Sequence, residues 1–461
     1  MNTMVFWSIL IALQLICLWA AYRSTQASQS TGAYFLGNKS LAFFPLLMSF
    51  IGTQIGGGLI LGSAEEAYRM GWSIIFYPLG MITGFLLLAT GLGGRLANLG
   101  VSTVAQVFET SYDSKRLRSL ASCLSILTLF LIVVAQVVAS RKFLATFGMD
   151  NPWSFLIIWG AVLVYTMRGG IIGIASIDAI QASFFLVVFG VAFAWLVMSN
   201  PELNLEAVLT HSFAVNNEQA PIIAWFMMPC LFMLCEQDMA QRCFSARTSH
   251  VVRSAAMVSA VLTSLICLVP IYLGLSGKML GISITEGSSV LMSVVQRLGN
   301  PILTAFVACA VMMAVVSTAV SLINSVSSNI IQDFKPAWNK KIATIMVGVS
   351  AIFCSFAFEN ALGLLIQSYE IYIVCLFVPI FMRLIGVRGS YLSAAMAIGF
   401  GAFGFLIFRF DPIHQMVFLP RELLELTLST MGFMCGKMIE SRQNPSRRAG
   451  SAMPILRGTV S

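Results

Sequence analysis

Polar side chains that interrupt long apolar runs are the residues of this sequence that could do chemistry. Thr53 and Gln54 come just before a run of three glycines at 56–58, and Asp178 lies eight residues after Gly170. A carboxylate deep in an apolar segment is costly, so such a residue is a functional candidate by default. The chemistry that these side chains offer is that of oxygen ligands, which hold hard cations and hydrogen-bond small polar solutes.

Two of the apolar segments carry residues that break helices. One holds the glycine run, and the other has Pro229 at its middle and the polar run Glu236-Gln237-Asp238 near its end. Glycine and proline are the poorest helix formers. In lipid, broken backbone is tolerated where it lines a cavity, and in transporters paired interruptions mark the binding site. Close helix packing through small residues is the alternative explanation of the glycines.

The composition places these segments in a membrane. Of the 461 residues, 58% are hydrophobic and 10% are charged, against about 25% charged residues in an average globular domain. This excludes a soluble enzyme, a disordered chain and a nucleic-acid-binding protein. The net charge of +8 comes from Lys and Arg scattered between apolar runs, and the ten Cys contain no CxxC pair. The pattern therefore favours neither a DNA-binding patch nor a zinc site.

Stretches of about 20 mostly apolar residues are long enough to cross a bilayer as helices. We predict an all-α polytopic membrane protein with about thirteen transmembrane helices, because the alternating pattern of membrane strands is missing. The predicted spans are 4–22, 41–66, 72–97, 117–140, 152–168, 172–198, 220–240, 252–275, 292–330, 341–358, 360–383, 390–409 and 414–436. The ninth is too long for one straight span, so we expect it to run on beyond the membrane.

The distribution of basic residues predicts the orientation of these spans. Most of the 27 Lys and Arg residues fall on one side of the predicted membrane, which the positive-inside rule assigns to the cytoplasm. The N-terminus is then outside and the C-terminus cytoplasmic. The two interrupted segments are five spans apart and opposite in direction, which indicates a five-plus-five inverted repeat.

This reasoning divides the chain into four parts. Residues 1–40 form an extra N-terminal helix and the first inner loop, and 41–383 form the ten-helix transport core. Residues 384–436 form two further helices, and 437–461 form a basic cytoplasmic tail that touches anionic lipid headgroups.

Five motifs, in order over about residues 30–400, resemble those of the sodium:solute symporter family. Members of that family transport sodium with sugars, proline, pantothenate or sialic acid. The motifs are YFLGNKSL at 34–41, GSAEEAYRMG at 62–71, RGG at 168–170 with Asp178 and Gln181, the stretch from Gln237 to Arg247, and STAVSLINS at 317–325. The resemblance implies the fold of the leucine transporter, sodium-driven symport and alternating access.

The resemblance also implies a sodium site between an unwound helix and an intact neighbour. The carbonyls of Gly52 and Ile55 would join the Ala314 carbonyl and the hydroxyls of Ser317 and Thr318. Ala314 and Thr318 are four residues apart and share a helix face. The alternative for the two hydroxyls is bonding to carbonyls of their own helix.

The family places an acidic residue at the position of Asp178, linked in some members to a second sodium or to a proton relay. Thr53 and Ser321 would complete such a second cation or proton site. Val320 stands where two-sodium members have another hydroxyl. A structural role, in which Asp178 bonds neighbouring helices, is the alternative.

The solute is expected at mid-membrane, between the two interrupted helices. The substrate-binding candidates are polar or aromatic residues of these segments: Gln54, Trp225, Phe226, Phe232, Gln237, Gln367 and Tyr369. Gln54 leads because it lies beside the expected unwound stretch. The set contains no Arg, which favours a neutral or zwitterionic solute over an anionic one.

The sequence thus predicts a secondary active transporter that couples Na⁺ to a small neutral or zwitterionic organic solute. We expect it in a plasma membrane, specifically a bacterial inner membrane, with no enzymatic activity and no organic cofactor. Its expected partners are the solute and the lipid bilayer, with no nucleic acid and no obligate protein. A proton-coupled or exchange transporter of the same fold, with Asp178 titrating, is the main alternative.

A membrane-embedded enzyme or channel is the remote alternative. Such an enzyme usually needs a cluster of His with Asp or Glu at an interface. The sequence has His211, His250 and His414, which the predicted spans place in loops or at span ends.

Overall fold

The computed structural model describes residues 1–24, 31–149, 151–201, 206–208, 210, 220–285, 287–334, 337–408 and 420–443. Residues 444–461 of the predicted tail, as well as His211 and His414, lie outside this part of the chain. Within it the secondary structure is helical, apart from one isolated backbone bridge between Leu41 and Ala246. The predicted all-α class is confirmed.

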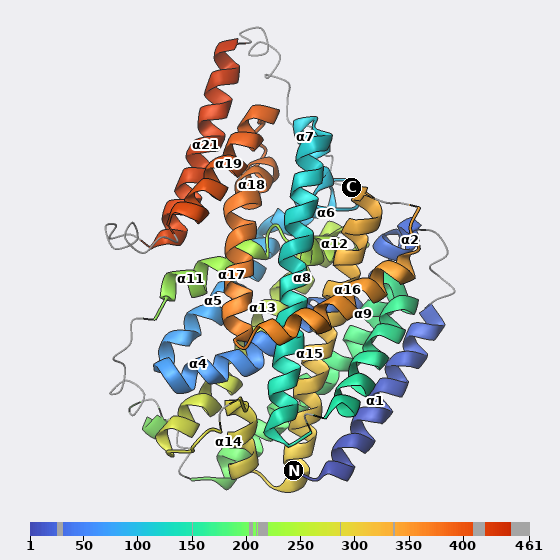
Figure 1. Ribbon diagram of the computed structural model, residues 1–461, viewed down its shortest axis with the longest axis vertical. Coiled ribbons are helices and arrows are strands. Elements are labelled where there is room, and N and C mark those ends of the chain that lie inside the picture. The colour runs from blue at the N-terminus through green and yellow to red at the C-terminus, as the bar shows by residue number, and fades with distance from the viewer. Residues whose placement is uncertain are drawn as a thin grey trace.

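The helices are arranged around a buried centre, with an antiparallel pair at one edge (Figure 1). In chain order they are α1 (Thr3–Ser24), α2 (Thr31–Leu36), α3 (Phe43–Gln54), α4 (Ser63–Met70), α5 (Phe76–Leu87), α6 (Gly93–Ala97), α7 (Gln106–Tyr112), α8 (Lys115–Thr146), α9 (Pro152–Ser199), α11 (Ile222–Phe232), α12 (Gln237–Ser245), α13 (Ser249–Met279), α14 (Val290–Leu298), α15 (Pro301–Asn329), α16 (Lys340–Cys354), α17 (Ala361–Tyr372), α18 (Val378–Leu384), α19 (Tyr391–Ile407) and α21 (Arg421–Gln443).

Nine helical runs in the described residues are long and apolar enough to cross a membrane. Two of them, Gly58–Ala97 and Pro152–Ser199, have 40 and 48 residues, about twice what one span needs. Each contains a glycine with positive φ, Gly71 at 72° and Gly170 at 54°. A side chain is strained in that conformation, so glycine permits the chain to turn there. These turns coincide with the predicted boundaries between neighbouring spans.

The ninth predicted span differs from the prediction, because it is two helices. α14 ends at Leu298, and α15 begins at Pro301 after Gly299 and Asn300. The Asn300 side chain accepts hydrogen bonds from the amides of Ile302 and Leu303, at 3.1 and 2.8 Å. A side-chain cap followed by proline at the first helical position is a strong helix start. The residues 414–419 of the last predicted span lie outside the described residues.

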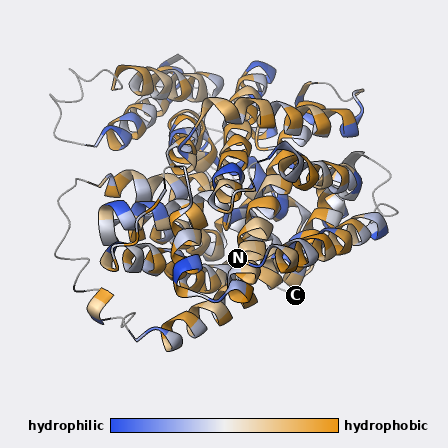
Figure 2. Ribbon diagram, turned by 60° about the horizontal axis from the view of Figure 1, so that its bottom comes forward, coloured by the Kyte–Doolittle hydropathy of each residue, from blue (hydrophilic) through white to orange (hydrophobic). Residues whose placement is uncertain are grey.

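α15 occupies the centre of the molecule. It packs against α9, α8, α3 and α1, and nearly every residue from Thr304 to Asn329 is buried. A helix that is buried on all sides in this way forms the core of the molecule. Hydrophobic residues also make up much of the outer helices (Figure 2), and apolar side chains such as Leu15 and Trp19 on α1 are 60% and 56% exposed. An exposed apolar surface of this extent requires lipid as its solvent.

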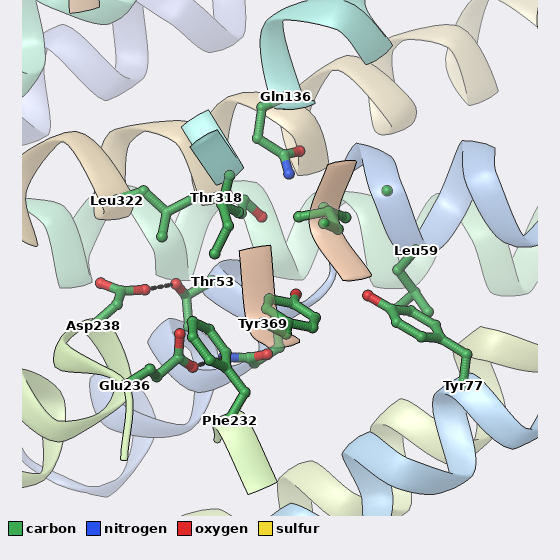
Figure 3. Close-up of a pocket in the computed structure, with 15 residues that line it drawn as sticks. Thr53, Leu59, Tyr77, Gln136, Phe232, Glu236, Asp238, Thr318, Leu322 and Tyr369 are labelled. Carbon is green, nitrogen blue, oxygen red and sulfur yellow. Dashed lines mark hydrogen bonds between the residues drawn. The ribbon is translucent and has the colours of Figure 1, made fainter. Parts of the chain in front are cut away.

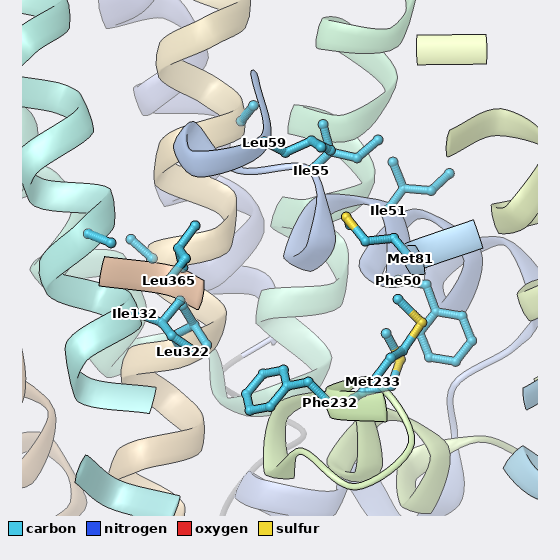
Figure 4. Close-up of a cluster of buried hydrophobic side chains, with 14 of the residues drawn as sticks. Phe50, Ile51, Ile55, Leu59, Met81, Ile132, Phe232, Met233, Leu322 and Leu365 are labelled. Carbon is cyan, nitrogen blue, oxygen red and sulfur yellow. The ribbon is translucent and has the colours of Figure 1, made fainter. Parts of the chain in front are cut away.

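Two of the core helices are interrupted, as predicted. α3 ends at Gln54, and the chain becomes helical again at Gly58, in a π-helical turn that leads into α4. α11 ends at Phe232, one turn after Pro229, and α12 begins at Gln237. Apolar side chains, including Phe50 and Ile51 of α3 and Met233 after α11, pack together beside the breaks (Figure 4).

The α3 and α12 halves of these interrupted helices are tied together at their far ends. The Leu41 amide donates to the Ser245 carbonyl, and the Arg247 amide donates to the Leu41 carbonyl, both at 3.0 Å. We call these two bonds, between Leu41 and the 245–247 segment, the clasp. The breaks and the clasp together position the residues of the candidate site.

Candidate functional site

The two helix breaks meet at the centre of the core (Figure 3). Gln54, the last residue of α3, donates from Nε2 to Glu236 Oε1 at 2.6 Å. The neighbouring Thr53 hydroxyl donates to Asp238 Oδ2 on α12. Polar residues that are costly in a membrane are thereby paired with one another across two interrupted helices.

α15 contacts the first break through its hydroxyls. In a continuous helix the Gly52 carbonyl would accept the Gly56 amide, but here it accepts Thr318 Oγ1 at 3.0 Å. The approach is close, because a Cβ on Gly52 would lie 2.5 Å from Ser317 Oγ and one on Gly56 would lie 2.6 Å from Thr318 Oγ1. The glycines are therefore required for the hydroxyls to reach the unwound backbone.

The other residues of the predicted sodium site lie on the same two elements. Ile55 is the first non-helical residue of the break, with φ −90° and ψ 78°. Ala314 is buried on α15, one turn before Thr318. Carbonyls at a helix break and hydroxyls on an adjacent helix are a donor set suited to a hard cation.

Asp178 on α9 is fully buried behind this contact. Its Oδ1 accepts Ser317 Oγ at 2.7 Å, and its Oδ2 accepts Ser49 Oγ at 2.5 Å and Ser321 Oγ at 3.5 Å. It also forms an ion pair with Arg242 Nη2 at 3.3 Å. The carboxylate thus links α3, α9, α12 and α15, while Thr53 bonds Asp238 and reaches Asp178 only through Arg242.

Arg242 is a central residue that the sequence reasoning did not include in the site. It is fully buried on α12 and donates from Nη1 to Asp238 Oδ1 at 2.5 Å and from Nη2 to Ser321 Oγ at 2.5 Å. Its spacing of four residues from Asp238, on one helix face, is a signal that could have identified the pair. Because two carboxylates surround the guanidinium, it offers no free positive charge to an anion.

A small cavity lies between the breaks, with a volume of about 20 Å³. Its walls include Gln54, Glu236, Phe232, Tyr369, Tyr77 and Thr318. The rings of Phe232 and Tyr369 are stacked, with centroids 4.3 Å apart (Figure 3). This volume holds about one water molecule, so an organic solute requires the helices around it to move apart.

Three of the predicted substrate residues, Gln54, Phe232 and Tyr369, line this cavity. The other four do not. Gln237 accepts the Val104 amide at 2.6 Å, and Gln367 is exposed. Trp225 and Phe226 lie about two turns before the break on α11.

Gln136, Glu236, Asp238 and Tyr77 were missed as lining residues. The polar run 236–238 was itself visible in the sequence, and Gln136 is an amide within an apolar span. Gln136 Oε1 accepts a hydrogen bond from the Gly57 amide at 2.8 Å. This bond gives a partner to a backbone amide at the helix break.

The architecture is that of membrane transporters whose solute site lies between two interrupted helices. The chain is similar to a solved Na⁺-coupled sialic acid symporter, with a TM-score of 0.80 at 15% identity over 95% of this chain and 98% of that one. It is also similar to MHP1, a nucleobase-cation-symport-1 family transporter, with a TM-score of 0.63 at 14% identity over 89% and 94% of the two chains. It is similar as well to MhsT, solved in complex with L-phenylalanine, with a TM-score of 0.58 at 15% identity over 86% of this chain and 97% of that one.

The profile of the sodium:solute symporter family matches residues 34–387, and the chain belongs to this family. The predicted family and the leucine-transporter-like fold are therefore confirmed. The protein is an integral membrane transporter that couples a small-molecule solute to co-transported Na⁺ by alternating access.

Proposed function

We propose that this symporter carries a small neutral or zwitterionic organic solute, held between the two helix breaks. The observation that carries this proposal is the pairing of the breaks around one cavity, with Gln54 bonded to Glu236. Arg242, the buried cation nearest to them, already pairs with Asp178 and Asp238. Among the described residues no other Arg or Lys is buried, so this part of the chain leaves no buried guanidinium for a strongly anionic solute.

We propose that Na⁺ is bound where α15 meets the first break. The carbonyls of Gly52, Ile55 and Ala314 and the hydroxyls of Ser317 and Thr318 are its ligands. The 3.0 Å contact between Thr318 Oγ1 and Gly52 O supports this, because it brings donor atoms from both elements together. A cation placed there would replace the Thr318 hydroxyl proton as the partner of the freed carbonyl.

We propose a second cation or proton site around Asp178, with Ser321 and Thr53. The bond of Ser321 to Asp178 and the shared contact of both with Arg242 support it. Ser317 also bonds Asp178, so one side chain connects the two sites. Binding of a cation or a proton at Asp178 would therefore affect Ser317, which is also a proposed Na⁺ ligand.

We propose further that residues 41–383 form the ten-helix transport core, flanked by 1–40, 384–436 and the basic tail 437–461. The N-terminus is outside and the C-terminus cytoplasmic in a bacterial inner membrane. The positive-inside distribution of Lys and Arg supports this orientation. We assign no enzymatic activity, nucleic-acid partner or obligate protein partner.

The sodium ligands are tested with the double variant Ser317→Ala and Thr318→Ala. Purified wild-type protein should gain thermal stability as Na⁺ replaces choline at constant ionic strength, since a ligand of the folded state stabilises it by RT ln(1 + [L]/Kd). In the double variant the Na⁺ concentration for half the effect should rise at least tenfold, or about 1.4 kcal/mol. An unchanged Na⁺ response in a folded double variant would contradict the assigned ligands.

A further inference from the structure

Glu236 is a buried carboxylate without a cationic partner in the described part of the chain. The centre of the core contains Asp178, Glu236 and Asp238, each at most 2% exposed. Arg242 forms ion pairs with Asp178 at 3.3 Å and with Asp238 at 2.5 Å, whereas Glu236 forms none with the described residues. A buried charge is normally paired, so an ionised Glu236 offers a bound cation a site that no described side chain occupies.

The position of Glu236 leaves part of its carboxylate open to the cavity. Glu236 lies in the break between α11 and α12, immediately before the first residue of α12. Its Oε1 accepts Gln54 Nε2 at 2.6 Å, and no described residue donates to Oε2. The residue lines the cavity (Figure 3), so this oxygen is available to a bound molecule.

Aromatic side chains line the same cavity. The stacked rings of Phe232 and Tyr369 have an interplanar angle of 27°, and Tyr77 contributes to the wall from α5. Aromatic faces attract organic cations through their negative quadrupole. A carboxylate beside aromatic faces is a combination suited to an ammonium group.

Sodium is a less suitable partner for this part of the cavity. The hydroxyl and carbonyl oxygens that favour a hard cation lie on the α15 side, where Thr318 meets Gly52. At Glu236, Gln54 Nε2 donates to the carboxylate, and the cavity wall includes Phe232, Tyr77 and Tyr369 as well as Thr53 and Asp238. The aromatic side chains distinguish this part of the cavity from the contact between Thr318 and Gly52.

We infer that the transported solute carries an ammonium group, and that Glu236 binds it as its counter-ion. Within the neutral and zwitterionic classes, this selects amine-bearing solutes such as amino acids and excludes sugars and polyols. Gln54 is a positioning residue that holds the carboxylate from the opposite break. This inference rests on the proposed function, in that it assumes the cavity is the solute site.

The test uses purified full-length protein in Na⁺ and measures thermal stability with a panel of compounds. The panel consists of L-amino acids, glycine betaine, choline and ethanolamine, and each primary amine is paired with the compound that has a hydroxyl in place of the amino group. We expect at least one amine to raise the melting temperature, while its hydroxyl counterpart does not. In Glu236→Gln the amine concentration for half the effect should rise at least tenfold, with the Na⁺ response retained.

Two further variants make the result decisive. Glu359→Gln removes one negative charge at an exposed position of the chain and should keep both responses. Glu236→Asp keeps the charge and shortens the side chain, so it should show a weakened amine response. It replaces Glu236→Gln as the test if that variant does not fold, and an amine response as strong as that of the wild type would then overturn the inference.

The inference is overturned by equal stabilisation by amines and their hydroxyl counterparts, or by an undiminished amine response in Glu236→Gln. It is also overturned by a Na⁺ response in the wild type with no response to any amine. Loss of the Na⁺ response alone in Glu236→Gln would assign the carboxylate to the ion and also overturns it. Absence of a Na⁺ response in the wild type would instead refute the proposed sodium ligands and leaves the amine comparison to be judged by itself.

Discussion

Asp178 has four partners, which raises the question of whether the residue serves transport or only holds helices together. It bonds Ser49, Ser317 and Ser321 and forms an ion pair with Arg242, and all of these partners are buried within the protein. The bond to Ser317 is the informative one, because Ser317 is also a proposed Na⁺ ligand. A change at Asp178 should therefore alter the response to Na⁺ as well as stability.

We predict that Asp178→Asn weakens the apparent Na⁺ affinity at least tenfold, or about 1.4 kcal/mol, and abolishes Na⁺-driven solute uptake. The amide can still hydrogen-bond the serines, and Arg242 keeps Asp238 as a partner, so the variant should fold. The measurements are Na⁺-dependent thermal stability and uptake into proteoliposomes.

The matched control for Asp178→Asn is Asp113→Asn. Asp113 is exposed and has a φ of 50°, a conformation that Asn also tolerates. It should behave as the wild type. If Asp178→Asn did the same in both assays, the residue would be structural.

At the residue scale, sequence reasoning identified polar residues in apolar surroundings but not their partners. Thr53, Gln54 and Asp178 stood out because each is costly in lipid. Arg242 and Glu236 were visible in the same way, yet their roles depend on which carboxylate meets the guanidinium. The spacing of four residues indicates the pair of Arg242 and Asp238. The pairing of Arg242 with Asp178 is instead decided by the packing of α3, α9, α12 and α15, which no local pattern encodes.

At the scale of elements, the first helix break works through its glycines. The glycines let α15 approach the unwound backbone closely enough for Thr318 to bond Gly52. The contact between α15 and the break therefore depends on glycine's lack of a Cβ as much as on the oxygen atoms that meet there.

We predict that Gly56→Ala weakens the Na⁺ response at least tenfold. Its Cβ would lie 2.6 Å from Thr318 Oγ1 and 2.8 Å from Gln136 Oε1, so the hydroxyl must move, and overpacking of this kind costs about 1–3 kcal/mol. Gly190→Ala on α9, where a Cβ meets nothing within 4 Å, should keep the Na⁺ response and stabilise by up to about 1 kcal/mol. Equal Na⁺ titrations for the two variants would show that close approach is unimportant.

The elements themselves were largely predictable, because hydropathy sets span positions and glycine or proline marks the breaks. The second break begins one turn later than Pro229, at the end of α11 at Phe232. Proline removes its own amide and disturbs the turn before it, so Pro229 indicates the interruption without fixing where the helix ends. The ninth span was mispredicted because α14 and α15 are both apolar. The hydropathy pattern continues across Asn300, whereas the capping side chain ends the helix.

At the scale of the whole molecule, the proposed orientation places Ser283 and Asn98 on opposite sides of the membrane. We predict that Ser283→Cys is labelled from outside intact cells by a membrane-impermeant thiol reagent, whereas Asn98→Cys is labelled only after lysis. Both residues are exposed in the structure. The background should lack the exposed Cys123 and Cys354. The opposite labelling pattern would invert the proposed topology.

The whole fold was predictable from span order and family motifs, whereas the small size of the cavity was not. Its small volume depends on side chains such as Leu322, Leu365 and Phe232 filling the space between separate helices. Such packing follows from the complete three-dimensional arrangement.

The clasp at Leu41 has a consequence for how motion in this protein can be observed. Two backbone hydrogen bonds join the start of α3 to the end of α12, so these two helix halves are mechanically one piece. Spectroscopic labels placed on both halves would report a constant distance throughout the transport cycle. A label on this piece paired with one on α15 or α8 would report any movement of the piece relative to these two helices.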